Sequence, residues 1–219
     1  MNPNENGDFT TEQIAMIRQS AERLQQHFDG TFNAETIERY IRSSRDILLP
    51  NATITTWLPL LIERVTRDRL RALARLDATT QTKPAVLFVC VHNAGRSQLA
   101  AGWLRHLANE QVDVFSGGTD PGDELNNDVV IAMAEVGIDL AGELPQPWTD
   151  EVARTADVIV SMGCGDACPI YPGKRYEEWD LPSPSNQQLD TVREIRDDVR
   201  TRVEALIASL RLETTTTTN

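Results

Sequence analysis

The stretch that most constrains how this chain folds runs from Val86 to Gln98 and reads VLFVCVHNAGRSQ. An apolar run leads directly into Cys90, and Arg96 and Ser97 follow after a gap of five residues. Behind them, apolar residues recur at the spacing of one helix face: Leu99, Trp103, Leu104 and Leu107. The pattern predicts a buried strand, a tight loop and a helix.

A loop of this kind predicts a site for an oxyanion. Backbone N–H groups and the positive end of the helix dipole point into it, and the Arg96 guanidinium can hold two oxygens at once. In that field Cys90 is expected to be a nucleophilic thiolate at neutral pH. The alternative is a buried cysteine that merely ends a strand. The expected anion-binding residues are Val91, His92, Asn93, Ala94, Gly95, Arg96 and Ser97.

Beyond this loop, strand and helix patterns alternate. Strands are predicted over 112–116, 157–161 and 174–179, and helices over 129–136 and 150–155, with a long apolar stripe from Val192 to Leu210. Such alternation predicts an α/β fold, a parallel four-stranded sheet flanked by helices, with ligands at the carboxyl ends of the strands. Cys90 lies at such an end.

The N-terminal part has a different pattern, that of a three-helix bundle. Thr10 and Gln13 form a capping box, Asn33 caps a second helix, and a third begins around Pro59. Each carries one apolar stripe, the third through Leu61, Val65, Leu73 and Leu76. This part has no cysteine and one histidine, His27, expected at the surface.

These patterns divide the chain into an N-terminal helical bundle over residues 1–80 and an α/β domain over 84–212. A polar linker joins them around 77–84. Residues 213–219 are a threonine-rich tail of low complexity, which is expected to be disordered.

Composition narrows the class of protein. A net charge of −12 argues against a nucleic-acid partner. No apolar run reaches the roughly 18 residues that a membrane helix needs, and the acidic N-terminus does not resemble a signal peptide. The three cysteines suit a reducing compartment. The sequence therefore predicts a cytoplasmic protein without a membrane partner.

The other two cysteines, Cys164 and Cys168, follow the strand predicted over 157–161, at the same sheet edge as Cys90. Their spacing, without a second ligand pair, does not indicate a metal site. One helical turn apart, they can approach the Cα separation of about 5.5–6 Å that a disulfide requires. The geometry permits a redox pair.

Two motifs resemble a known family. Cys90-x-x-Asn93-x-x-Arg96-Ser97 resembles the phosphate loop shared by low-molecular-weight protein tyrosine phosphatases and the arsenate reductases related to them, and the longer run from Phe88 to Gln98 is closer to the reductases. The run Cys-Gly-Asp-Ala-Cys-Pro over 164–169 resembles the redox segment of thioredoxin-coupled, triple-cysteine arsenate reductases, although Cys168 follows sooner here.

The resemblance implies reduction of arsenate to arsenite, a step in arsenic detoxification, with no cofactor or metal. Cys90 would form a covalent arsenic adduct, Cys164 would attack Cys90, and Cys168 would attack Cys164, leaving a disulfide for thioredoxin or another thiol reductant. Asn93 matches the residue that shapes the loop, and the Ser97 hydroxyl matches the one that hydrogen-bonds the thiolate. Phosphate or sulfate would compete with arsenate.

The same resemblance implies a general acid. The family places an aspartate directly before a proline, downstream of a tryptophan. Here Trp179 and Asp180 are followed by Leu181 and Pro182, so Asp180 is the candidate, with a structural role as the alternative.

Two other functions stay open: a low-molecular-weight protein tyrosine phosphatase, and a non-catalytic anion or thiol sensor. The extra thiols argue against the phosphatase, since hydrolysis needs no electron donor. His92 is expected to be a loop residue rather than a general base, and His106 is expected to be a histidine on a helix surface. The bundle is expected to serve association, as a homodimer interface.

Overall fold

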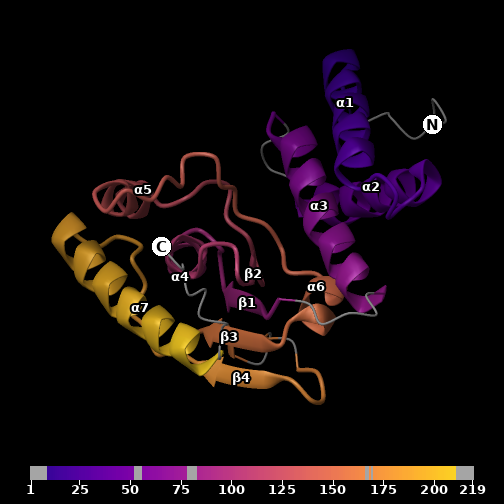
Figure 1. The fold of residues 1–219 in the computed structure, drawn as a ribbon. Coiled ribbons are helices and arrows are strands. Elements are labelled where there is room, and N and C mark those ends of the chain that lie inside the picture. The colour runs from indigo at the N-terminus through magenta and orange to yellow at the C-terminus, as the bar shows by residue number, and fades with distance from the viewer. Residues whose placement is uncertain (1–8, 52–55, 78–82, 166–167, 169, 211–219) are drawn as a thin grey trace, which may run out of the picture. The chain divides into compact units, whose positions relative to one another are not determined.

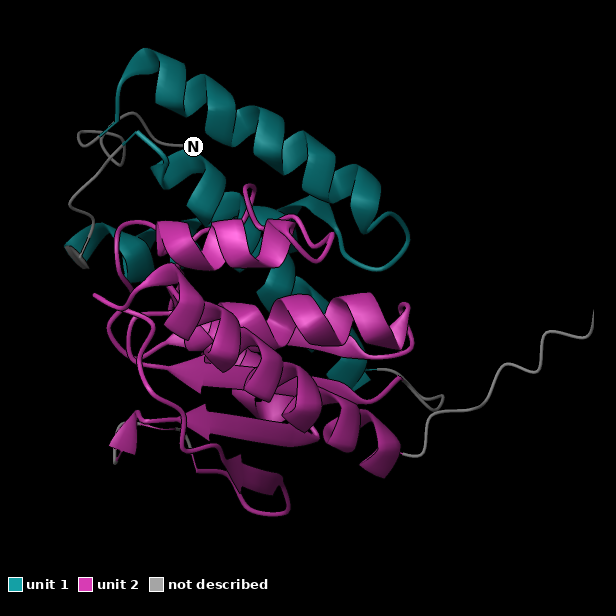
Figure 2. Cartoon of the chain, turned by 90° about the vertical axis from the view of Figure 1, so that its left-hand side faces the viewer, with its two compact units in different colours: residues 1–79 teal, residues 80–219 magenta. Residues whose placement is uncertain are grey.

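The computed structural model describes residues 9–51, 56–77, 83–165, 168 and 170–210. The chain forms two compact units, residues 1–79 and 80–219, drawn in separate colours in Figure 2. Most of the predicted linker and all of the tail predicted over 213–219 lie outside the described residues.

The first unit contains three helices, as the sequence predicts: α1 (Thr11–His27), α2 (Ala34–Leu48) and α3 (Leu58–Asp77), with a short 3₁₀ turn at Leu49–Asn51 (Figure 1). The Thr10–Gln13 capping box is present at the start of α1, and the Asn33 side chain accepts a hydrogen bond from the backbone N–H of Thr36 at the start of α2. Both caps satisfy backbone donors that a helix start leaves free.

The apolar stripes of the three helices meet in one core, but the stripe of α3 ends earlier than expected. Leu76 is 53% exposed; it lies in the last turn of α3, beyond Leu70, the last α3 residue in this core. The buried apolar residues of this core are Ile17, Leu24, Phe28, Ile37, Ile41, Leu48, Leu58, Ile62, Val65 and Leu70.

The bundle also buries an acidic side chain that the apolar pattern did not predict. Glu63 on α3 accepts hydrogen bonds from Ser20 over 2.7 Å and from Arg23 over 2.5 Å, and pairs with Arg67 over 2.7 Å. Burial favours the neutral acid, but these hydrogen bonds and charges outweigh it, so the pKa of Glu63 lies below its ordinary value. The polar network ties α1 to α3.

The second unit is a parallel four-stranded sheet, as the alternating pattern predicts, and its strand order is β2-β1-β3-β4. Figure 1 shows the sheet with helices lying against it. The strands are β1 (Ala85–Cys90), β2 (Asp113–Gly118), β3 (Val158–Met162) and β4 (Arg175–Glu178), and the helices are α4 (Arg96–Ala108), α5 (Asn127–Ala134), α6 (Asp150–Thr155) and α7 (Leu189–Ser209).

Several strand and helix boundaries differ from the predicted ones by one or two residues. The strand predicted over 112–116 runs from Asp113 through Gly117 and Gly118, which pair in register with Val89 and Cys90. Helix α5 begins and ends two residues earlier than predicted, since the Asn126 side chain caps it by accepting from the backbone N–H of Val129. The apolar stripe alone does not show such a cap.

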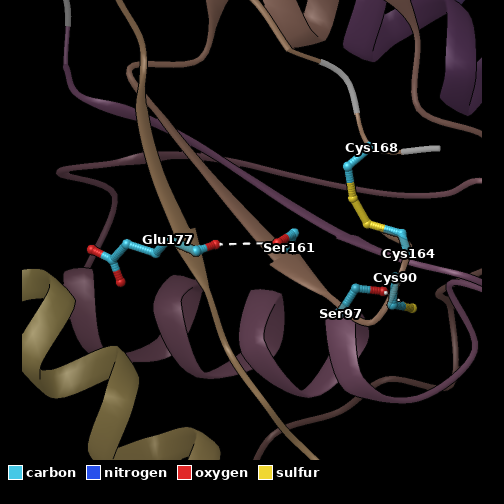
Figure 3. Close-up of a disulfide and its surroundings, with 6 residues drawn as sticks. All are labelled: Cys90, Ser97, Ser161, Cys164, Cys168 and Glu177. Atoms are coloured by element: carbon cyan, nitrogen blue, oxygen red, sulfur yellow. Dashed lines mark hydrogen bonds between the residues drawn. A yellow bond between two sulfur atoms is a disulfide. The ribbon is translucent and has the colours of Figure 1, made fainter. Parts of the chain in front are cut away.

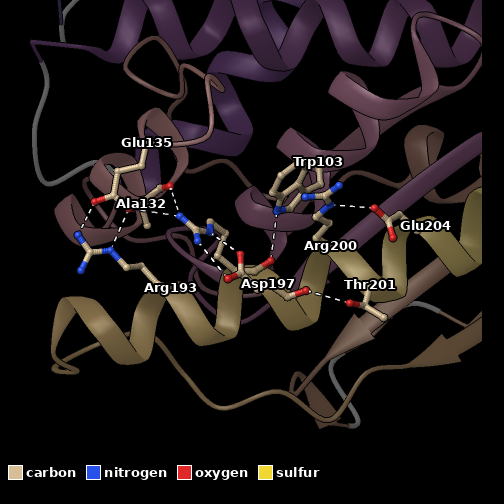
Figure 4. A network of polar contacts seen from close by, with 9 residues as sticks. Trp103, Ala132, Glu135, Arg193, Asp197, Arg200, Thr201 and Glu204 are labelled. Atoms are coloured by element: carbon tan, nitrogen blue, oxygen red, sulfur yellow. Dashed lines mark hydrogen bonds and ion pairs between the residues drawn. The ribbon is translucent and has the colours of Figure 1, made fainter.

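Helix α7 is held to the rest of this unit by contacts of its arginines (Figure 4). The Arg196 guanidinium donates to the carbonyl of Ala132 at the end of α5 over 2.9 Å, and Trp103 on α4 donates to the Arg196 carbonyl over 3.2 Å. Arg193 and Arg196 both pair with Glu135. Helix α4, which begins at the Cys90 loop, is therefore tied to α7 through Trp103.

Of the helices in the described part of the chain, none is long and apolar enough to cross a membrane.

Candidate active site

Cys90 lies where the central strand β1 ends and the loop to α4 begins. All six residues of β1 are buried, and Cys90 itself is 2% exposed. The backbone N–H of Asn93 donates to its sulfur over 3.2 Å, and the Ser97 hydroxyl oxygen lies 3.0 Å from the sulfur. The sulfur is thus enclosed by polar groups of its own loop, as the motif predicts.

Asn93 gives the loop its shape. Its φ of 50° is in the left-handed region, which asparagine adopts more readily than other residues that carry a Cβ. Its side chain is buried, and Nδ2 donates to Ser97 Oγ over 2.8 Å. The loop-shaping role that the resemblance implies for Asn93 has a direct structural basis.

The helix after the loop adds a positive field. Helix α4 starts at Arg96, and no side chain caps it at Gly95. The first-turn N–H groups and the positive end of the helix dipole therefore lie at the Cys90 loop. Together with Arg96, they provide the local attraction for an anion that a chain of net charge −12 needs.

Arg96 lies between two segments that follow other strands. Its Nη1 donates to the carbonyl of Leu181 over 3.4 Å. On another side it contacts Gly163, where an added Cβ would lie 2.7 Å from Nη1. Gly163 directly precedes Cys164, so Arg96 contacts the segment that carries Cys164. The sequence motif gave no sign of this contact.

Asp180 directly precedes Leu181, whose carbonyl accepts a hydrogen bond from Arg96. It is exposed, and its neighbours Trp179 and Leu181 are buried. The segment is fixed by a hydrogen bond of 2.9 Å from the Trp179 N–H to the Ser161 carbonyl and by the contact of Leu181 with Arg96. This position is compatible with either of the two roles considered for Asp180.

Cys164 and Cys168 form a disulfide beside this site (Figure 3), with a Cα–Cα distance of 5.7 Å. Cys90 pairs in register with Met162 of β3, so Cys164 follows the adjacent strand at the same edge of the sheet. Cys164 is 8% exposed and Cys168 is half-buried, whereas Cys90 is a free thiol. The intervening Asp166 and Ala167, and also Pro169, lie outside the described residues.

A cluster around Tyr171 anchors the chain after Cys168, and sequence reasoning missed it. The Tyr171 hydroxyl donates to Asp150, which also pairs with Arg154 over 2.5 Å. Burial and the bond to Asp150 raise the pKa of Tyr171 to about 12, so the hydroxyl stays a donor at neutral pH. In the sequence, only the adjacent Tyr171 and Pro172 distinguish this segment, and they form no spacing motif.

The remaining polar candidates stay apart from the sulfur. His92 and His106 are exposed, and His106 lies edge-on to Trp103. Among the described residues, no three histidine, cysteine, aspartate or glutamate side chains are grouped as metal ligands would be.

The fold and the site define a class: α/β proteins with a buried cysteine in the loop between the first strand and the helix that follows it. The chain belongs to the low molecular weight phosphotyrosine protein phosphatase family, whose model matches residues 85–216. Residues 17–74 match a second model, the protein-tyrosine-phosphatase-like N-terminal domain.

Within this family the chain is similar to arsenate reductases. It is 35% identical to a putative arsenate reductase of Halobacterium salinarum over 53% of this chain and 85% of that protein. It is also 35% identical to the glutaredoxin arsenate reductase of Synechocystis sp. over 57% of this chain and 97% of that protein.

A solved structure is similar along almost the whole chain. The thioredoxin-dependent arsenate reductase of Corynebacterium glutamicum is 40% identical and superimposes with a TM-score of 0.75, covering 90% of this chain and 96% of that one. An arsenate reductase in a phosphate-binding state is 33% identical, with a TM-score of 0.52 over 58% of this chain and 98% of that one.

Proposed function

We propose that this protein reduces arsenate to arsenite by means of three thiols. The observation that supports this most strongly is the placement of a Cys164–Cys168 disulfide at the sheet edge where the free thiol of Cys90 lies in its oxyanion loop. Reduction of arsenate needs two electrons, and two thiols that close to a disulfide supply two. The arsenate reductases among its relatives support the same substrate.

The chemistry begins with binding. Arsenate occupies the loop from Val91 to Ser97, held by backbone N–H groups and Arg96. The Cys90 thiolate attacks As(V), an oxygen leaves as water, and an S–As bond forms. Phosphate or sulfate, which have the same tetrahedral shape, compete for this loop.

The electrons move in the next step. The Cys164 thiolate attacks the Cys90 sulfur, which forms an S–S bond and breaks the S–As bond. The bonding pair stays on arsenic, so As(V) leaves as As(III) in arsenite. Cys168 then attacks Cys164, freeing Cys90 as a thiolate and leaving the Cys164–Cys168 disulfide.

The different burial of the three cysteines favours one direction of thiol–disulfide exchange. Cys90 and Cys164 are buried, whereas Cys168 is partly exposed. The last disulfide therefore has one sulfur nearer to solvent, where an external dithiol can attack. Thioredoxin is the proposed reductant, with glutaredoxin or a small thiol as the alternative, because relatives with either name are similar to this chain.

Phosphatase activity is the second candidate function. The match to the phosphatase family supports it for the Cys90 loop only. Its reaction would use Cys90, Arg96 and a general acid, but would leave the adjacent disulfide without a role. A sensor that binds an oxyanion without turnover uses the same loop. Tight binding of phosphate with no product would identify it.

The test is to incubate the reduced full-length protein with arsenate, with and without a thioredoxin system, and to measure the arsenite released. We expect continued release with the thioredoxin system and about one arsenite per chain without it. Absence of arsenite under both conditions, with p-nitrophenyl phosphate still hydrolysed, contradicts the proposal in favour of the phosphatase.

Two further proposals concern the setting of this reaction. A redox relay that ends on a reducible disulfide fits the cytoplasm, where thioredoxin and glutathione keep thiols reduced. The helical bundle, a compact unit with its own core, is proposed as the interface of a homodimer.

A further inference from the structure

Asn93 is the centre of a buried chain of hydrogen bonds that ends at the Cys90 sulfur. Its Nδ2 donates to Ser97 Oγ over 2.8 Å, and Ser97 Oγ lies 3.0 Å from Cys90 Sγ. Its Oδ1 accepts from Gln98 Nε2 over 3.1 Å and from the backbone N–H of Gln146 over 3.0 Å. Since Asn93, Ser97 and Gln98 have no exposed surface, water does not compete for these bonds.

These donors decide which way the Asn93 amide faces. A backbone N–H only donates, so the Asn93 atom that faces Gln146 is the oxygen. Nδ2 then faces Ser97 Oγ and donates a hydrogen bond to it. The Ser97 hydroxyl hydrogen is left to point at the Cys90 sulfur, and a hydrogen bond donated to the sulfur favours the thiolate.

Burying the Gln98 side chain costs stability, and its contact with Asn93 accounts for why this cost is tolerated. It lies in the first turn of α4, and its Oε1 is buried without a hydrogen-bond partner among the described residues. An unsatisfied buried carbonyl destabilises a fold, whereas an apolar side chain of similar volume would not. The contact that offsets this cost is the one from Nε2 to Asn93.

We propose that Gln98 is a positioning residue for the Cys90 nucleophile. Together with the Gln146 backbone N–H, the Gln98 amide donates to Asn93 Oδ1 and so restrains the Asn93 amide in the orientation in which Ser97 must donate to the sulfur. The inference rests on the proposed function in taking Cys90 as the nucleophile, but its consequence is a property of the thiol and is measured without arsenate.

The test uses the full-length chain with Cys164→Ser and Cys168→Ser, in which Cys90 is the only thiol. The ultraviolet absorbance of the thiolate is followed against pH, and the same titration of a chain that also carries Cys90→Ser is subtracted. Gln98→Met should move the midpoint upward by about 0.5–1 pH unit, which leaves roughly three- to tenfold less thiolate below the midpoint. Well above both midpoints the two chains should absorb equally.

Gln146→Met is the matched control. Its side-chain amide donates to the Ser116 carbonyl over 3.1 Å, and the substitution keeps the backbone N–H that binds Asn93. The midpoint should stay within error of the parent chain. A shift as large as that of Gln98→Met would mean that any disturbance of buried amides here moves the titration, and would overturn the proposal.

A second comparison separates positioning from loss of packing. In a chain that carries Ser97→Ala, the last link to the sulfur is missing, so adding Gln98→Met should give no further shift. An equal shift in that background overturns the proposal, as does an unchanged midpoint in a folded Gln98→Met chain. Gln98→Leu carries the same expectations and replaces the methionine variant if circular dichroism shows that the latter has not folded.

Discussion

At the residue scale, the proposed reactivity depends on a few groups around one sulfur. The Asn93 backbone N–H and the Ser97 hydroxyl contact the Cys90 sulfur, and Arg96 follows in the same loop. The sequence spacing predicted all three, because the strand–loop–helix pattern fixes where a motif of this length must lie. The same spacing does not show which hydrogen atom points at the sulfur.

Asp180 is the residue whose proposed role is tested most simply by substitution. If it protonates the departing oxygen, Asp180→Asn should lower the rate of arsenate reduction by about 10²–10⁴-fold, the usual contribution of a general acid. Glu178→Gln, which changes another exposed carboxylate close by in sequence, should leave the rate unchanged. A loss of less than roughly threefold in Asp180→Asn would mean that the acid lies elsewhere or that none is used.

The lowered pKa of Glu63 predicts how the stability of the fold depends on pH. Burial would raise its pKa, but the bonds from Arg23 and Ser20 outweigh this and lower it below its ordinary value of 4.5. A carboxyl whose pKa is lower in the folded chain stabilises the fold above the unfolded pKa, and this stability is lost as the pH falls through the folded pKa. Acid below about pH 4.5 should therefore weaken the bundle.

Glu63→Gln should remove this part of the pH dependence. Between about pH 7 and pH 3, the thermal midpoint of the full-length variant should fall less than that of the parent, by roughly 2–4 °C, the shift that about 1 kcal/mol gives in a chain of this size. Glu38→Gln, at an exposed position on α2, should fall as the parent does. Parallel curves for Glu63→Gln and the parent would rule out this account of Glu63.

At the scale of elements, the Thr10–Gln13 capping box, the Asn33 cap, the apolar stripes and the parallel sheet were predictable, since each follows from a local sequence pattern. Contacts between distant segments were not. Gly163 against Arg96 and Tyr171 with Asp150 join residues far apart in sequence, and no spacing marks them. The early start of α5 depends on the Asn126 cap, which the apolar stripe does not include.

We predict that Gly163, in the segment after β3, sets the position of the Arg96 guanidinium. Gly163 has a φ of +70°, so Gly163→Ala introduces backbone strain and also places a Cβ against the guanidinium. Phosphate binding, measured by calorimetry on the full-length chain, should weaken by about tenfold, which corresponds to about 1.4 kcal/mol.

Gly173→Ala provides the matched control. Its φ is +78°, and nothing lies within 4 Å of the added Cβ, so it carries the strain without the clash. Both variants should lose similar thermal stability, but only Gly163→Ala should lose affinity for phosphate. Equal affinities in the two variants would show that Gly163 does not set the position of Arg96.

At the scale of the whole molecule, we propose that the α/β unit carries out the chemistry and that the helical bundle mediates association. Deleting residues 1–80 should leave phosphate binding intact, because every residue of the proposed site lies beyond them. The mass in solution, measured by light scattering, should fall from that of a dimer to that of a monomer. Deleting residues 211–219 instead should leave the dimer in place. An unchanged oligomeric state after removal of the bundle would exclude it as the interface.

The central claim is that three thiols act in sequence, and the most direct measurement is the number of arsenite molecules released per chain in the presence of a thioredoxin system. Cys90→Ser should release none. Cys164→Ser should also release none, yet still hydrolyse p-nitrophenyl phosphate, because its anion loop is untouched. Cys168→Ser should release about one and then hold a Cys90–Cys164 disulfide, visible by mass spectrometry and slow to reduce while buried. Undiminished multiple turnover by Cys164→Ser would contradict the relay and leave a single-cysteine enzyme that uses an external thiol.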